Sequence, residues 1–272
     1  MFKFQKNFNL HVIYRHSANN NDYGSSRPSW FSHQKCLDNF LRTAELASNS
    51  KIRLRLHFVF DGTEEEFNRN PASLSIAKFR QREGFVILPI YFFKGGSALA
   101  SFYKMREVVD SPLIGEKDYL YLLENDYLHT SDWIPNLEDI LSSSVEFDYL
   151  SLYDHGDKYP YTSGFLKRYK ELRSRIFATK SRHWRTAPST CFSFITKKSI
   201  FLEDWPLIDI GQPDHVIFRV LREVNRRILL TPMPSLSTHC MKGGLAPVVN
   251  WEELSLAADV RGDQRFQKSE NP

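Results

Sequence analysis

The chain of 272 residues contains only three cysteines, Cys36, Cys191 and Cys240. They form no Cys-x-x-Cys pair, so the sequence indicates neither a zinc site nor a disulfide framework. Reduced thiols are the simplest interpretation. The sequence has no uncharged run of about 18 residues that could cross a membrane, and its first residues hold no long apolar segment typical of a secretory signal. We therefore expect a cytoplasmic protein, and contact with a membrane surface is compatible with this expectation.

Four common enzyme signatures are also missing, because GxxxxGK[ST], GxGxxG, HExxH and GxSxG do not occur. Their absence argues against a P-loop NTPase, a nicotinamide dehydrogenase, a zincin and an α/β-hydrolase. The 36 basic and 32 acidic residues leave a net charge of +4. This mild excess suits acidic ligands and does not indicate nucleic acid as a partner.

Apolar runs of strand length alternate with stretches of helical periodicity along most of the chain, and 42% of the residues are hydrophobic. This alternation predicts an α/β fold with a Rossmann-like opening unit. We expect one domain over residues 1–260 and a polar tail over residues 261–272. The expected strands lie near residues 10–14, 54–60, 85–90, 118–126, 147–153, 191–196 and 227–230. The expected helices lie near residues 28–44, 73–82, 97–109, 133–141 and 213–224.

The stretch from Asp118 to Asp126 is the centre of the functional hypothesis. It begins as an apolar run and ends in Glu124-Asn125-Asp126. These acids would lie at the carboxyl edge of the sheet, where open α/β folds bind ligands. Two carboxylates there can hold a hard divalent cation and leave positions open for phosphates. An ordinary polar turn at a strand end is the alternative.

Six short motifs occur in an order that resembles the GT-A glycosyltransferases, in particular the large inverting SpsA-like family (family two-like). They are residues 11–17, Asp61-Gly62-Thr63, Gly95-Gly96-Ser97, Glu124-Asn125-Asp126, Gln212-Pro213-Asp214 and Ser237-Thr238-His239. The resemblance covers roughly residues 9–240. It implies a three-layer sandwich with a mostly parallel, mixed central sheet. Arg15 and the Gln-Pro pair before Asp214 depart from the usual family pattern.

The resemblance also implies a reaction, the inverting transfer of a sugar from a nucleotide diphosphate to a hydroxyl. A nucleotide-binding half near residues 9–126 would precede an acceptor-binding half near residues 127–260. Mn²⁺ or Mg²⁺, held by Asp126 and His239, would neutralise the departing diphosphate. Asp214 would deprotonate the acceptor hydroxyl. The implied nucleotide contacts are Tyr14, Arg15, Asp61, Gly95, Gly96, Ser97, Glu124 and Asn125.

The acceptor would be a saccharide or a lipid-linked glycan, near Asp154, His155 and Trp251. Each of these residues also has a structural explanation, such as core packing for Trp251. The stretch Lys167 to Arg185 holds eight basic residues, and it is either a solvated surface or a contact for a phosphate-bearing acceptor or an anionic membrane. The sequence does not define the oligomeric state.

Two other functions fit a similar sheet. A nucleotidyltransferase would also use paired acids and a metal, but it normally has a Gly-rich basic loop after the first strand, whereas this loop is rich in Asn and Ser. A non-catalytic glycan- or nucleotide-binding module would bind without turnover.

The metal hypothesis makes a structural demand, because the Asp126 carboxylate must face an open cavity. Burial of Asp126 in an ion pair with an arginine would contradict it.

Overall fold

The computed structural model describes residues 7–18, 26–80, 86–162 and 172–256. Its central sheet has nine strands in the order β3-β2-β1-β4-β9-β6-β10-β8-β7, and β11 pairs with β5 in a separate ribbon. The strands are β1 (Phe8–Ser17), β2 (Ile52–Asp61), β3 (Val86–Phe93), β4 (Tyr119–Glu124), β5 (Tyr127–His129), β6 (Tyr149–Leu150), β7 (Ile176–Ala178), β8 (His183–Thr186), β9 (Phe194–Lys197), β10 (Leu229–Met233) and β11 (Ser237–His239).

The central sheet is mixed and mostly parallel. Strands β3, β2, β1 and β4 are parallel neighbours, as are β6 and β10. Strands β9 and β8 run against their neighbours, so seven of the nine strands share one direction. The expected α/β class and the mostly parallel sheet are therefore confirmed. The carboxyl ends of β1, β2 and β4 lie at the same edge of the sheet.

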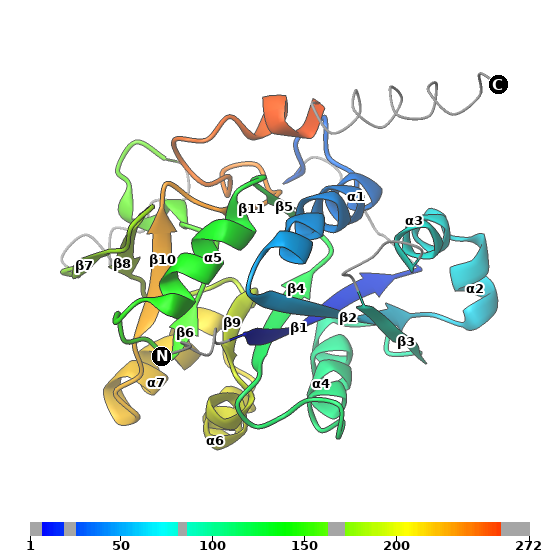
Figure 1. Ribbon diagram of the computed structural model, residues 1–272, viewed down its shortest axis with the longest axis horizontal. Helices are drawn as coiled ribbons and strands as arrows, with labels where there is room; N and C mark the ends of the chain where they lie inside the picture. The colour runs from blue at the N-terminus through cyan, green and yellow to red at the C-terminus, as the bar shows by residue number, and fades with distance from the viewer. Residues whose placement is uncertain (1–6, 19–25, 81–85, 163–171, 257–272) are drawn as a thin grey trace, which may run out of the picture.

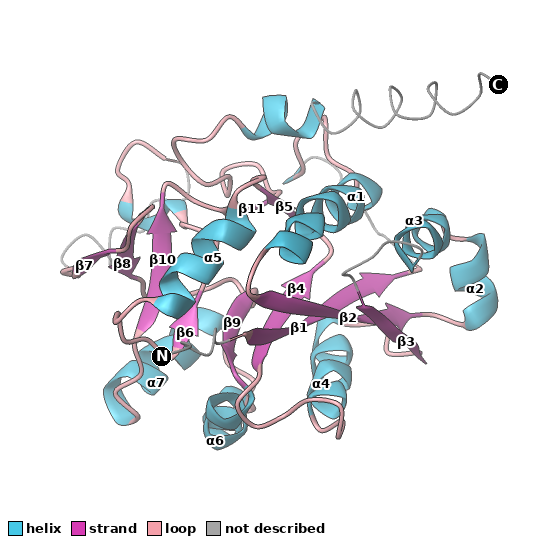
Figure 2. Cartoon of the chain, in the orientation of Figure 1, coloured by secondary structure: helices cyan, strands magenta, loops and turns pink. Residues whose placement is uncertain are grey.

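Helices cover both faces of this sheet and complete a three-layer sandwich (Figures 1 and 2). One apolar core lies between the sheet and the layer of α1, α3 and α5, and a second lies on the face of α4, α6 and α7. The longer helices are α1 (His33–Ala44), α3 (Pro71–Arg80), α4 (Ala98–Val109), α5 (Trp133–Ser142), α6 (Lys198–Ile208) and α7 (Asp214–Val224). The short ones are α2 (Glu64–Arg69), η2 (Glu45–Asn49) and η3 (Gly156–Lys158).

Several elements differ from the sequence expectation. Helix α1 begins at His33 and not near Pro28, because the Ser32 hydroxyl accepts a hydrogen bond from the Lys35 amide and caps the helix there. The strand expected over residues 147–153 is limited to β6. Helix α6 was not expected. Strands β7 and β8 were not expected either, because short strands of mixed polarity carry little periodicity. Part of the basic stretch and the expected tail lie outside the described residues.

The segment over residues 231–250 follows the last expected strand, and no element was expected in it. It contains the end of β10 and all of β11, which pairs with β5. Across the described residues, no helix is long and apolar enough to cross a membrane.

Candidate functional site

The site begins where β1 and β4 leave the sheet side by side. Arg15 of β1 is the register partner of Glu124 at the end of β4. Opposite residues of paired strands point to the same face. The Arg15 guanidinium therefore donates directly to Glu124 Oε1 in an ion pair. Both residues were expected in the site, and the structure brings them together.

Asp126 and His239 also meet, because β5 begins just after Asp126, β11 ends at His239, and the two strands pair antiparallel. His239 is the register partner of Tyr127, and its ring stacks on that tyrosine with the centroids 5.2 Å apart. His239 Nε2 lies 3.0 Å from Asp126 Oδ2. The expected pairing of these two residues is thus present, with His239 on a short strand.

Arg27, a residue that the sequence analysis did not single out, occupies the centre of the site. Its guanidinium donates to Asp126 Oδ2 at 2.8 Å and to the Cys240 carbonyl at 2.9 Å. It also lies over the Phe31 ring, 4.7 Å from the centroid. Arg27 and Asp126 are only 8% and 7% exposed. A single arginine in an irregular segment has no spacing signature, so no sequence signal was available.

These charges shift the titration of the acids and the histidine. Burial alone raises the pKa of Asp126, but His239 and Arg27 outweigh it, so the pKa lies well below its usual value. Burial alone lowers the pKa of His239, but the Asp126 carboxylate outweighs it and raises that pKa. Burial raises the pKa of Glu124 despite the neighbouring Arg15. Arg15, Arg27 and the His239 ring thus face the carboxylates of Glu124 and Asp126, and Asp214 adds a further negative charge nearby.

The donor set does not fit the expected divalent metal as the residues are arranged. Asp126 Oδ2 already accepts from Arg27 and His239, and a guanidinium occupies the place of a cation. Among the described residues, no group of three or more His, Cys, Asp or Glu side chains could hold a metal ion. Asp126 Oδ1 is buried without a hydrogen-bond partner among those residues, but a single oxygen is too few for Mn²⁺ or Mg²⁺. The buried ion pair between Arg27 and Asp126 is the arrangement that contradicts the metal hypothesis.

A cavity of about 330 Å³ opens beside the Arg15–Glu124 pair. Phe102 and Phe192 line it as apolar walls, and Gln212 adds a polar group. A largely apolar cleft with a few polar groups at one end is the usual form of a small-molecule site. Its position at the carboxyl edge of β1 and β4 makes the pair accessible from one side.

Asp61, at the carboxyl end of β2, binds backbone. Its two carboxylate oxygens accept from the Gly95 and Gly96 amides, each at 2.9 Å. Gly96 has φ of +64°, which favours glycine. Ser97 then caps α4 by accepting from the Ala100 amide. The sequence motif is therefore assembled, and Asp61 fixes the turn between β3 and α4.

Replacing Asp61 with alanine is expected to lower the free energy of unfolding by about 2 kcal/mol, because two amides lose charge-assisted hydrogen bonds. Asp61→Asn keeps one acceptor oxygen and should have a smaller effect. Urea denaturation measures both. Equal stability of all three proteins would show that this carboxylate does not hold the turn.

Asp214, the expected base, lies in the first turn of α7. Its Oδ2 accepts from the Thr190 and Cys191 amides at 3.1 and 2.7 Å. Cys191 and Phe192 have φ of +51° and +56°, so Asp214 stabilises a strained turn that borders the cavity. Its charge also contributes to the raised pKa of Glu124. Asp214 thus lies near the acids and already has a structural role.

Tyr14 lies inside the core, whereas Asn125 lies between the two acids of the site. Tyr14 is 1% exposed and its ring stacks on Phe58 inside the core, so it presents no face to a base. The Asn125 carbonyl lies 3.3 Å from His33 Nδ1, and its side-chain amide lies 3.4 Å from His16 Nδ1. The burial of Tyr14 thus argues against a nucleotide contact, whereas Asn125 is half-buried and its role stays a prediction.

The residues expected near the acceptor contact other parts of the protein. Asp154 is buried and accepts from Arg185 Nη2 and from the Tyr159 hydroxyl, each at 2.5 Å. Trp251 is 2% exposed and donates to the Ala246 carbonyl at 2.8 Å, so its ring offers no surface for a sugar. His155 is partly exposed, with its ring edge-on to Tyr153. Asp154 thus forms a buried ion pair with Arg185, and Trp251 packs in the core.

Neither a protein-family model nor a curated protein sequence matches the chain. Solved structures with a similar fold do exist. The galactosyltransferase LgtC, in complex with donor and acceptor sugar analogues, is 11% identical, with a TM-score of 0.39 over 77% of this chain and 69% of that one. A protein of Desulfovibrio desulfuricans described as a nucleotide-diphospho-sugar transferase is 9% identical, with a TM-score of 0.41 over 82% and 78%.

A synthase is similar to the same degree. The 4-diphosphocytidyl-2C-methyl-D-erythritol synthase of Anaerococcus prevotii is 9% identical, with a TM-score of 0.44 over 94% of this chain and 96% of that one. The class of protein expected from the motifs is therefore found among the structural neighbours, together with a second class. The likeness concerns architecture, and the activities of these proteins are not carried over from it.

Proposed function

We propose that the carboxyl edge of β1 and β4 binds the diphosphate of a nucleotide sugar and that the protein transfers the sugar to a hydroxyl of a saccharide or glycan. The observation that carries this proposal is the Arg15–Glu124 pair at an open cavity, with Arg27 and His239 gathered at Asp126, two residues beyond Glu124. Guanidinium groups match phosphate oxygens in pairs and stay charged when they are partly buried. The acceptor would enter from the half formed by residues 127–260.

Protein cations would neutralise the leaving group in this proposal. As the bond from the anomeric carbon to the diphosphate breaks, negative charge develops on the phosphate oxygens. Preorganised positive groups stabilise such charge most strongly where little water screens it. Arg15 lines the cavity directly. Arg27 and His239 contact Asp126, two residues beyond Glu124, and their positive charge would add to the same field.

The acceptor hydroxyl needs a base as it attacks the anomeric carbon from the side opposite the diphosphate. Asp214 is the proposed base, because one of its oxygens is fixed by the turn at residues 190–191. Its other oxygen, Oδ1, lies 4.0 Å from His215 Nδ1, and the side chain is 16% exposed. The hydroxyl proton would pass to this oxygen. The displacement would invert the anomeric centre.

Replacing Asp214 with asparagine should abolish transfer and spare nucleotide affinity. The amide oxygen can still accept from the two backbone amides, so the turn remains, but the side chain no longer takes a proton. Product formation and the Kd for nucleoside diphosphate measure the two effects separately. Asp209→Asn, at an exposed acid lining the same cavity, is the matched control. Wild-type turnover in Asp214→Asn would reject the base role.

A panel of nucleotide sugars, assayed for nucleoside diphosphate release with Mn²⁺ and with chelator, tests the whole proposal. Release should occur in both conditions, because Arg27 occupies the position of a cation at Asp126. Loss of release in the presence of chelator would support the divalent metal that was expected from the sequence. Pyrophosphate release from a nucleoside triphosphate would instead assign a nucleotidyltransferase, and binding without any product would favour a non-catalytic module.

A further inference from the structure

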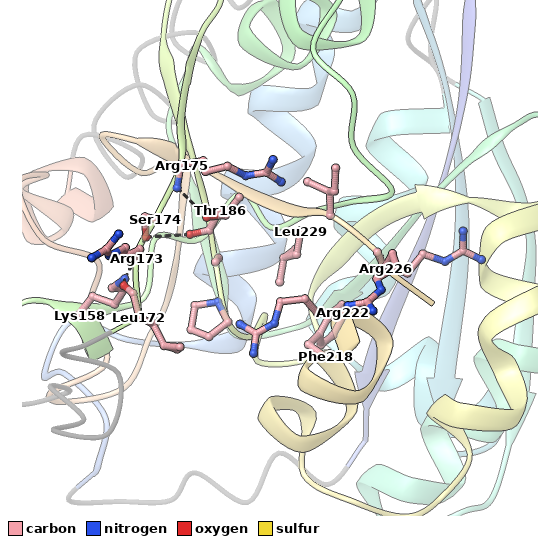
Figure 3. Close-up of a pocket in the computed structure, with 14 residues that line it drawn as sticks. Lys158, Leu172, Arg173, Ser174, Arg175, Thr186, Phe218, Arg222, Arg226 and Leu229 are labelled. Carbon is pink, nitrogen blue, oxygen red and sulfur yellow. Dashed lines mark hydrogen bonds between the residues drawn. The ribbon is translucent and has the colours of Figure 1, made fainter. Parts of the chain in front are cut away.

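A second cavity, of about 500 Å³, lies at the far end of α7 (Figure 3). It separates the segment of residues 172–175 from the last turns of that helix. Six basic side chains and no acidic one line it: Lys158, Arg173, Arg175, Arg222, Arg226 and Arg227. Such an excess of one charge around one cavity is unfavourable unless an anion or salt compensates it.

The acids of the surrounding structure compensate only part of this charge. Arg227 is bound by Asp204 at 2.8 Å and by Glu203 at 2.9 Å. Arg173, Arg175 and Arg226 are exposed, and within the described part of the chain no carboxylate lies within ion-pair distance of them. All three residues line the cavity, and the Arg175 guanidinium also lies over the Phe177 ring, 5.7 Å from its centroid. Their charge is therefore available to a ligand at this cavity.

The wall that carries Arg173 and Arg175 is held in place by hydrogen bonds. Ser174 Oγ donates to the Thr186 carbonyl at 3.2 Å, and the Arg175 amide donates to Thr186 Oγ1 at 3.0 Å. Lys158 Nζ donates to Ser174 Oγ at 2.9 Å. The segment is thus tied to β8, and its arginines start from a fixed backbone.

The opposite wall holds Arg226 in an unfavourable backbone conformation. Arg226 has φ of +58° and follows the C-cap of α7, Asn225. Glycine is usual at this position, and a residue with a side chain costs about 1 kcal/mol there. The chain nevertheless places an arginine where its side chain lines the cavity.

We propose that this cavity binds an anionic ligand that carries two or more phosphate groups. Arginines on both walls would bind the phosphates, because a planar guanidinium donates to two oxygens at once. Phe218, Pro188 and Leu229 provide an apolar part of the lining for the carbon portion of the ligand. The cavity is distinct from the candidate site, because no residue lines both cavities.

Calorimetric titration with inorganic pyrophosphate at near-physiological salt tests this site. The wild type should bind saturably, and Arg226→Gly should weaken the affinity about tenfold or more, the effect of one lost phosphate contact. Glycine suits the backbone at residue 226, so this variant is expected to fold. Arg173→Ser should act in the same direction from the other wall. Arg219→Gln removes an exposed charge of α7 that does not line the cavity, and it should change the affinity less than about twofold.

The same variants distinguish a free ligand from a membrane headgroup. Co-sedimentation is measured with phosphatidylcholine vesicles containing a phosphatidylinositol monophosphate. Vesicle binding that depends on Arg226 and Arg173, without affinity for pyrophosphate, assigns the site to a lipid headgroup, whereas pyrophosphate binding assigns a soluble ligand. Arg15→Ala should remove any pyrophosphate binding at the candidate site and leave the binding that depends on Arg226 and Arg173 unchanged. The proposal is overturned if the wild type binds neither probe, or if Arg219→Gln loses as much affinity as Arg226→Gly.

Discussion

Replacing Arg27 with methionine is expected to lower the free energy of unfolding by about 3 kcal/mol or more, since breaking a buried ion pair leaves one charge uncompensated. The Asp126 carboxylate would remain buried, with His239 as the partner of its Oδ2. Urea denaturation of the purified variant measures this loss. A change below about 0.5 kcal/mol, the usual range for surface substitutions, would show that the pair is not formed.

The double variant Arg27→Met with Asp126→Leu separates stability from function. Two apolar side chains replace the pair, so most of the lost stability should return. Affinity for nucleoside diphosphate should not return, because the positive charge is still missing. A double variant that binds the nucleotide as well as the wild type would remove Arg27 from the proposed site.

Acidification below about pH 6.5 is expected to destabilise the protein steeply, because three buried histidines are neutral in the folded state. Burial lowers the pKa of His57 to about 3, of His129 to about 3 and of His16 to about 4. The unfolded chain binds protons at these positions below about pH 6.5, whereas the folded chain does not. Stability is therefore lost as the pH falls, over the window from about 6.5 to about 4.

The expected slope is about 1.4 kcal/mol per pH unit for each histidine, or about 4 kcal/mol per unit for the three together. Urea denaturation between pH 7 and about pH 5 measures this slope. His129→Gln should lower it by about one third, whereas His183→Gln, at an exposed position, should leave it unchanged. A slope that is the same in both variants would mean that His129 is not held neutral.

His239 acts in the opposite direction. Its pKa is raised by Asp126, so its contribution to stability is present at low pH and is lost as the pH rises through the folded-state pKa. Stability should therefore be greatest near neutral pH. The same protonation adds positive charge to the candidate site.

The regular elements of the fold were accessible from sequence because their apolar residues repeat with the period of a strand or helix. The runs that became β1, β2 and β4 are buried over most of their length. Helix α7 shows a clear apolar stripe with Ile217 and Leu221 buried. Strands β7 and β8 were missed, because three or four residues of mixed polarity hold too few repeats to reveal a period.

The candidate site was accessible only in part. The resemblance to the GT-A glycosyltransferases implied that Asp126 and His239 lie together, and the ribbon of β5 and β11 brings them together. The position of Arg27 depends on tertiary contacts with Asp126 and Cys240 that are 99 and 213 residues away in sequence. No local pattern encodes such contacts. The same limit explains Tyr14 and Trp251, since an aromatic residue in a core and one in a binding cleft look alike in sequence.

A crystal structure of the protein with nucleoside diphosphate and Mn²⁺ tests the central claim most directly. We predict that the diphosphate oxygens lie on the Arg15 side of the cavity, that Arg27 keeps its contact with Asp126, and that no metal bridges the carboxylate and the phosphates. A Mn²⁺ ion bound by Asp126 and the diphosphate, with Arg27 displaced, would contradict this account.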